Sequence, residues 1–119
     1  MSLNIGIRQL QDVRVVDVQG RITLGDGASE LREAVRMMTA EGHRKILLNL
    51  AEVSYIDSAG LGVLVSAFAS VTHQGGQVKL LNLTKRVQDL LLITKLYTVF
   101  EVFGDEGSAL RGFAEMPVA

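Results

Sequence analysis

The segment from Lys45 to Gln74 places an apolar, strand-like run shortly before a long uncharged run, and this arrangement constrains the fold most. Residues 45–50 have the sequence Lys-Ile-Leu-Leu-Asn-Leu. This near-continuous apolar pattern is typical of a central strand covered by helices on both faces. Residues 59–74 predict a helix that ends at Gly75-Gly76. Strands alternating with helices indicate an α/β layer fold with a mostly parallel sheet and right-handed crossovers.

Similar patterns on either side of this unit complete the expected architecture. Apolar alternation and short apolar runs predict further strands at Leu3–Ile7, Val13–Val18, Gln77–Leu81 and Val99–Phe103. Three further helices are expected, with N-cap residues Asp26, Thr84 and Asp105, and Gly42 ends the first of them after Glu41. The expected apolar face of this first helix is Ala28, Leu31, Ala34 or Val35, and Met38, at spacings of three and four. The expected order is ββαβαβαβα, in one domain over residues 1–119 with a core at about 3–114. The sheet is expected to be mixed, with four to five strands and about four helices.

The composition excludes several classes of function. The net charge is -1, from 12 Lys and Arg against 13 Asp and Glu, so no basic surface for direct nucleic-acid binding is expected. The chain has no Cys and two widely separated His, which argues against disulfides, metal sites and metal cofactors. No uncharged run reaches the ~20 residues of a membrane span, and the N-terminus lacks a signal pattern, so a cytoplasmic protein that does not contact membranes is expected.

The junction Asp57-Ser58 lies between the central strand and the long helix. Asp and Ser are preferred N-cap residues, so the pair alone indicates little more than a cap. A hydroxyl at a helix start is exposed, close to free backbone N–H groups and the positive end of the helix dipole. An added phosphate would be attracted by the helix and repelled by Asp57. Ser58 is therefore a candidate switch.

The helix that follows carries no Lys, Arg, Asp or Glu between Ser58 and Gln74. Its expected core stripe is Leu61, Leu64, Phe68 and Val71. The opposite side consists of Ala59, Gly62, Val63, Ser66, Ala69, Ser70 and His73. Exposed helix faces are usually charged, so this one is expected to be covered, either by another protein, the reading we favour, or by another element of the same chain. Gly60 and Gly62 cost about 1 kcal/mol each relative to Ala, which indicates a close approach of backbone at the helix start.

Two catalytic or signalling alternatives use the same residues. A Ser hydrolase would need a His beside Ser58, but His73 lies about 22 Å along the same helix and His43 about 20 Å away along the strand. A two-component receiver would use Asp57 as its phosphate acceptor. It would also need an acidic pair after the first strand and a Lys after the last, whereas the chain offers Asp12 alone and no such Lys. Both alternatives rank low.

The stretch from Leu48 to Leu64, with Asp57-Ser58-Ala59-Gly60-Leu61-Gly62 at its centre, closely resembles the signature of STAS domains, specifically bacterial anti-sigma factor antagonists. The resemblance covers nearly the whole chain. It includes Gly20, the helix around Glu30–Arg32, the Gly75-Gly76 turn and the stretch Leu90–Val102.

This resemblance implies a non-catalytic regulator that works by partner switching. In the family, the unphosphorylated protein binds a partner that is both anti-sigma factor and Ser kinase, phosphorylation releases it, and a phosphatase resets it. Ser58 matches the acceptor, and Asp26 matches an acidic residue of the loop after the second strand. The expected partner-binding residues are Asp26, Asp57, Ser58, Ala59, Gly60, Gly62, Val63 and Ser66. A monomer or weak dimer is expected.

Two positions differ from the family pattern. Ala59 replaces a second hydroxyl that many members carry, and the loop from Arg21 to Gly27 is slightly longer than usual. An alternative is therefore a STAS scaffold in a larger signalling assembly, in which Ser58 is never modified.

Overall fold

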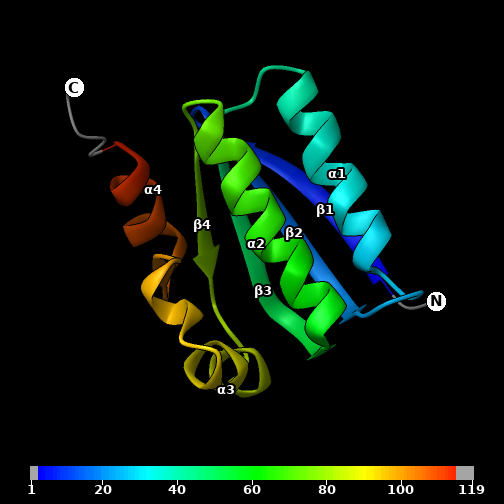
Figure 1. Ribbon diagram of the computed structural model, residues 1–119. Helices are drawn as coiled ribbons and strands as arrows, with labels where there is room; N and C mark the ends of the chain where they lie inside the picture. The colour runs from blue at the N-terminus through cyan, green and yellow to red at the C-terminus, as the bar shows by residue number, and fades with distance from the viewer. Residues whose placement is uncertain (1–2, 115–119) are drawn as a thin grey trace.

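The computed structural model describes residues 3–114, which form one mixed sheet with helices on both faces (Figure 1). The strands are β1 (Leu3–Leu10), β2 (Val13–Ile22), β3 (Lys45–Ile56), β4 (Gln77–Leu81) and β5 (Val102–Phe103). The helices are α1 (Ala28–Ala40), α2 (Ser58–His73), α3 (Lys85–Ile93), the 3-10 turn η1 (Leu96–Thr98) and α4 (Glu106–Ala114). This order confirms the predicted ββαβαβαβα fold.

The strands lie in the sheet in the order in which they occur in the chain, β1-β2-β3-β4-β5. Only β1 and β2 are antiparallel, as a hairpin, and the other neighbours are parallel. The strand β3 is central, and its residues Ile46, Leu47 and Leu48 are fully buried, as their apolar run predicts. The carboxyl ends of the parallel strands, the start of α2 and the helix α3 share the lower end of Figure 1.

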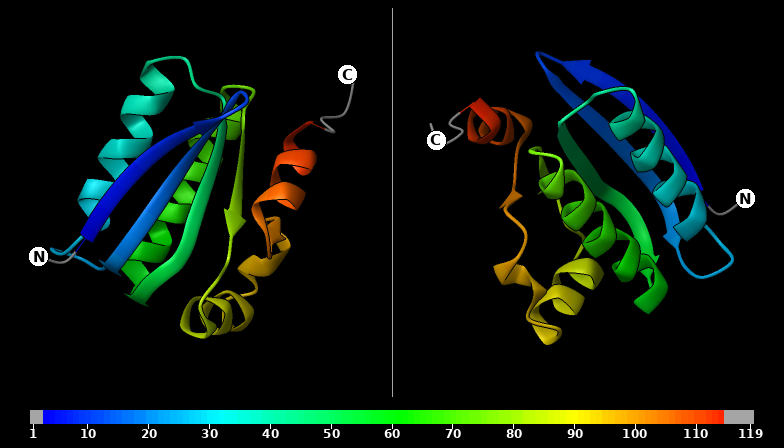
Figure 2. Two further views of the ribbon diagram at one scale, coloured as in Figure 1. Left: turned by 180° about the vertical axis from the view of Figure 1, so that it is seen from behind. Right: turned by 45° about the horizontal axis from the view of Figure 1, so that its top comes forward.

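Helices cover the two faces of the sheet unequally. Both α1 and α2 lie on one face, over the larger hydrophobic core, whereas α4 covers part of the other face (Figure 2). The smaller core beneath α4 consists of Val13, Val15, Leu47, Leu81, Ala109 and Phe113. The buried residues of α1 are Ala28, Leu31, Val35, Met38 and Thr39, which confirms the face expected from their spacing.

The start of α1 differs from the sequence prediction, because Gly27 and not Asp26 is the N-cap residue. The backbone of Asp26 is held in a turn, donating to the carbonyl of Thr23 over 2.9 Å and accepting from its N–H over 2.8 Å. Gly27 has φ 102°, and a Cβ there would lie 2.1 Å from the carbonyl oxygen of Arg21, so only glycine fits. The predicted caps Thr84 and Asp105 are confirmed by hydrogen bonds from the backbone N–H groups of Val87 and Ser108.

Four strands also differ in length from their predictions, since β1 continues to Leu10 and β2 to Ile22. The strand β3 continues through Ile56 because its last residues pair with β2, with register shifts between Asp17 and Gln19 and between Gly20 and Arg21. The strand β5 contains only Val102–Phe103. The turn η1 precedes Val99, which accounts for the later start of β5.

Candidate functional site

Asp57 joins the start of α2 to the loop between β2 and α1. Its Oδ1 accepts a hydrogen bond of 2.8 Å from the N–H of Gly60, which caps the helix as predicted. Its Oδ2 accepts one of 3.0 Å from the N–H of Leu24. These two backbone N–H groups hold the pKa of Asp57 below its usual range, with Leu24 contributing most. Asp57 is therefore a fixed negative charge at neutral pH.

Ser58 is the first residue of α2, and it is exposed. Its hydroxyl follows the capping carboxylate directly in the sequence, at the end of the helix where backbone N–H groups lack intrahelical partners. Ala59, the next residue, is half-buried. The structure thus leaves Ser58 accessible to a modifying enzyme, between a helix dipole that favours negative charge and a carboxylate that opposes it.

The two glycines of the first helical turn have different surroundings. A Cβ at Gly60 would lie 2.0 Å from the carbonyl oxygen of Ile22 and 2.8 Å from Cγ1 of Ile56. Gly60 therefore allows α2 to pack directly against the backbone of β2. At Gly62 a Cβ would meet no atom within 4 Å. The fold itself explains the first glycine, but the intramolecular packing gives no reason for the second.

The loop before α1 brings two further residues to this end of the molecule. Leu24 is 80% exposed, although its N–H is bound to Asp57. Asp26 is half-buried, and its Oδ2 lies 3.8 Å from Nε of Arg21. The structure therefore brings the loop of Asp26 to Asp57 through Leu24, a residue that sequence reasoning missed. The only available signal was an isolated leucine in the glycine-containing loop Thr23-Leu24-Gly25-Asp26.

Comparisons with known proteins identify the family. Residues 4–109 match the STAS domain family. The anti-sigma-B factor antagonist of Bacillus subtilis is 35% identical over 102 residues, which cover 86% of this chain and 92% of that protein. The chain belongs to the STAS domain family.

Solved structures share this fold at lower identity. An anti-sigma factor antagonist from Mycobacterium paratuberculosis superposes with a TM-score of 0.86 at 19% identity, over 96% of each chain. The Bacillus cell fate determinant SpoIIAA in its phosphorylated form has a TM-score of 0.72 at 16% identity, over 92% of this chain and 98% of the other. At these identities the likeness shows the fold of the STAS domain.

The uncharged side of α2 in this STAS domain is only partly open. Val63 is 1% exposed and Ala67 is 6% exposed, because α1 packs against that flank. A shallow groove of about 200 Å³ follows the seam, lined by Arg32, Val35, Arg36, Thr39, Val63, Ser66, Ala67 and Ser70. The exposed residues of α2 are Ser58, Gly62, Ser66, Ala69, Ser70, Thr72 and His73. The same chain therefore covers Val63, contrary to its expected place on the open face, and leaves Gly62 and Ser66 exposed.

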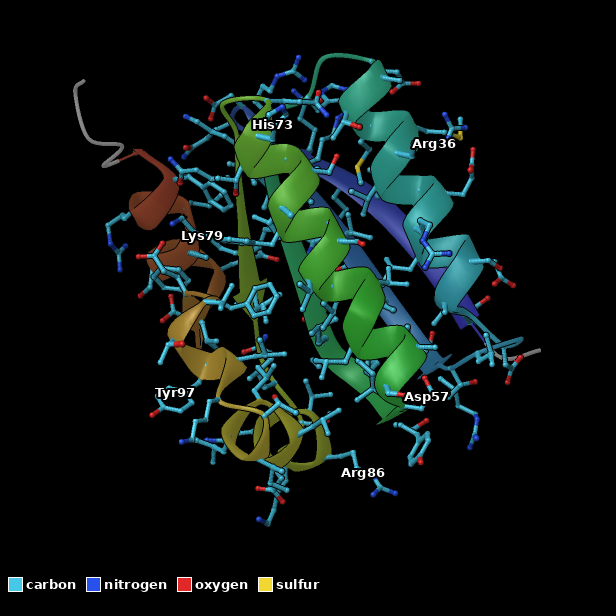
Figure 3. The ribbon with its side chains drawn as sticks, in the orientation of Figure 1. Arg36, Asp57, His73, Lys79, Arg86 and Tyr97 are labelled. Atoms are coloured by element: carbon cyan, nitrogen blue, oxygen red, sulfur yellow. The ribbon has the colours of Figure 1, made fainter. Side chains whose placement is uncertain are left out.

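The structure places neither histidine beside Ser58. Figure 3 shows His73 and Asp57 at opposite ends of α2. His43 lies just before β3 and accepts a hydrogen bond from Nε of Arg14. Within residues 3–114 no cluster of His, Cys, Asp or Glu is arranged to hold a metal ion. No helix in this described part is long and apolar enough to cross a membrane.

Proposed function

We propose that this STAS domain is an anti-sigma factor antagonist that binds a partner with anti-sigma factor and Ser kinase activities and is released when Ser58 is phosphorylated. The observation that carries the proposal is the exposed Ser58 hydroxyl at the start of α2, directly after the doubly hydrogen-bonded Asp57. The name of the Bacillus subtilis relative supports the antagonist role. The phosphorylated SpoIIAA structure supports a phosphorylation switch on this fold.

The electrostatics of the site explain why phosphorylation would release a partner. A phosphoserine carries a charge of about -1.5 to -2 at neutral pH. Because the pKa of Asp57 is lowered, its carboxylate stays charged beside that phosphate. A partner packed on this end of the molecule would have to desolvate both groups, which costs more than it gains unless new cationic contacts form. A phosphatase that removes the phosphate would restore binding.

The proposed partner surface combines the loop before α1 with the first two turns of α2. Its members are Leu24, Asp26, Asp57, Ser58, Ala59, Gly62 and Ser66. Gly60 supports this surface from within, because it sets the distance between α2 and β2. Val63 supports it by packing against α1. The open space at Gly62 would let a partner approach the helix backbone closely.

Binding calorimetry tests the proposal with the candidate anti-sigma factor kinases of the source organism. The unmodified protein is expected to bind one of them, and Ser58→Asp is expected to weaken that binding at least tenfold. Thr72→Asp is the matched control, because it adds the same charge to an exposed position near the other end of α2. Equal affinity of wild type, Ser58→Asp and Thr72→Asp would reject an electrostatic switch at Ser58.

A further inference from the structure

Two arginines from different elements place their guanidinium groups over one tyrosine ring, at the end of the sheet that carries Ser58. The guanidinium carbon of Arg21 lies 5.0 Å from the ring centroid of Tyr55, and that of Arg86 lies 4.4 Å from the same centroid. Arg21 is in β2, Tyr55 is its register partner in β3, and Arg86 is in the first turn of α3. Figure 3 shows Arg86 and Asp57 at the same end of the molecule.

The strand register and the packing of α3 bring these three side chains together. The register shift between Gly20 and Arg21 sets Arg21 opposite Tyr55, two residues before Asp57. The helix α3 packs against β3, which brings the guanidinium group of Arg86 over the same ring. Each guanidinium is attracted by the electron-rich face of the ring. Two like charges thus lie at one ring, an arrangement that an anion between or beside them would stabilise.

The arginines keep most of their hydrogen-bonding capacity. A guanidinium that stacks through its flat face has its N–H donors in the plane of the group, where they can bind a carboxylate through two bonds. Arg21 is 54% exposed, and its nearest carboxylate, Asp26, lies 3.8 Å away, too long for a hydrogen bond. Arg86 is exposed, and the ion pairs within residues 3–114 do not include it.

We propose that Arg21 and Arg86, stacked on Tyr55, form a receptor for an acidic side chain of the protein that binds at Ser58. The identity of the occupant rests on the partner proposed above, whereas the receptor itself rests on the geometry of the three side chains. The receptor adds two positive charges at the edge of the partner surface, at the end of the molecule that also carries the negative charges of Asp26 and Asp57. It therefore fixes the orientation of the partner, because the partner must present an acidic group on one side of Ser58 only.

A protein carboxylate fits this cluster better than a nucleic acid does. Binding a nucleic acid of useful length needs a row of cations along the backbone. Here the net charge is -1, and Nε of Arg21 lies 3.8 Å from the carboxylate of Asp26. Two isolated guanidinium groups suit one or two carboxylates of a partner protein. The protein's own carboxylates at this end of the molecule would repel an extended polyanion.

NMR titration of the full chain tests the receptor without the partner. The probe is N-acetylated penta-glutamate, and N-acetylated penta-lysine, a peptide of the same length and opposite side-chain charge, is its control. We expect saturable shifts of the Nε–Hε signals of Arg21 and Arg86 and of the Tyr55 ring with penta-glutamate, and none with penta-lysine. The shifts should weaken as salt is added, since exposed charges are screened. Shifts that spread over all arginines, or shifts centred on Arg32 and Arg36, would overturn the proposal.

Substitutions test whether the two arginines bind a carboxylate or only contact the Tyr55 ring. Arg86→Gln and Arg21→Gln are expected to abolish the saturable response, and Arg86→Lys, which keeps the charge but loses the planar fork, should retain only part of it. Arg111→Gln, on the exposed surface of α4, is the matched control.

In calorimetry with the kinase partner, Arg86→Gln should lower affinity at least tenfold while Arg111→Gln does not. If wild type binds no kinase but responds to penta-glutamate, the proposed function fails and the receptor stands. If wild type binds the kinase and both arginine variants bind equally well, the receptor fails alone.

Discussion

The backbone N–H of Leu24 donates a hydrogen bond of 3.0 Å to Oδ2 of Asp57, and this contact joins two segments that lie 33 residues apart in the sequence. The other carboxylate oxygen of Asp57 caps α2 through Gly60. One side chain therefore fixes both the loop that carries Asp26 and the helix that begins at Ser58. The two parts of the proposed partner surface are held together by this carboxylate.

Removing the carboxylate should loosen both segments. Asp57→Ala is expected to lower the thermal midpoint and to speed amide hydrogen exchange at Leu24 and Gly60. Because the folded-state pKa of Asp57 is lowered, its stabilising effect is present above the unfolded pKa of about 3.9 and is lost as pH falls through the folded value. The difference between wild type and Asp57→Ala should therefore vanish in acid. Equal amide protection in the two proteins at pH 7 would contradict the role of Asp57.

The two glycines of α2 should respond in opposite ways to alanine. Gly60→Ala would place a Cβ 2.0 Å from the carbonyl of Ile22, so α2 must shift, at a cost of about 1–3 kcal/mol or more. Gly62→Ala meets open space and should stabilise the helix by up to about 1 kcal/mol. Urea denaturation measures both free energies of unfolding. A stable Gly60→Ala variant would show that the helix start tolerates a wider separation from β2.

Local patterns in the sequence predict much of this fold. The spacing of Leu31, Val35 and Met38 predicts the buried face of α1 because that face depends on helical periodicity alone. Thr84 and Asp105 predict their helix starts for a similar reason, since a cap acts over three residues. These features need no information about distant parts of the chain.

The missed features depend on contacts between distant segments. Asp26 is a good cap by residue type, but its turn with Thr23 shifts the helix start to Gly27. Val63 belongs to the open side of an isolated helix, and only the packing of α1 buries it. The stacking of Arg86 on Tyr55 requires the exact position of α3 beside β3, which no short pattern encodes. Part of the candidate site therefore follows from sequence, whereas its margins follow from tertiary structure.

Arginine substitutions should affect partner binding on the exposed side of α2 and folding on the side covered by α1. Gly62→Arg and Ser66→Arg place a large side chain on exposed positions, so binding of the anti-sigma factor kinase should be lost. Their thermal midpoints should stay within a few degrees of wild type, the shift that about 1 kcal/mol produces in a domain of this size. Val63→Arg should instead unfold the protein, because Val63 is 1% exposed. Pull-down assays and thermal melts measure the two effects, and normal binding by Ser66→Arg would remove this flank from the partner surface.

The buried charge of Lys79 should lower the free energy of unfolding. Its side chain is 7% exposed and contacts Glu101, and its Nζ lies 5.9 Å from the ring centroid of Phe103 and 5.3 Å from that of Phe113. Burial lowers the pKa of Lys79, so the unfolded chain binds the proton more tightly than the folded protein does. The free energy of unfolding should therefore rise as pH increases from the folded pKa toward the unfolded value of about 10.4.

The variant Lys79→Met should remove this dependence and raise the thermal midpoint at pH 7. Glu101 is 66% exposed, so water can solvate it once its partner is gone. Thermal melts between pH 7 and pH 10.5 measure the effect. Lys85→Met is the control, since Lys85 is 86% exposed. A lower midpoint for Lys79→Met than for Lys85→Met would show that the Lys79 charge stabilises the fold on balance.

Phosphopeptide mapping after incubation with ATP and the binding kinase tests the central claim most directly. Intact mass should show the addition of one phosphate, and mapping should place it on Ser58 alone. Ser58→Ala should take up no phosphate, should fold normally because Asp57 and not Ser58 caps α2, and should remain bound to the kinase when ATP is present. Phosphate on Thr23, Ser66 or Ser70 with Ser58 unmodified, or stoichiometric phosphorylation of Ser58→Ala, would contradict the account.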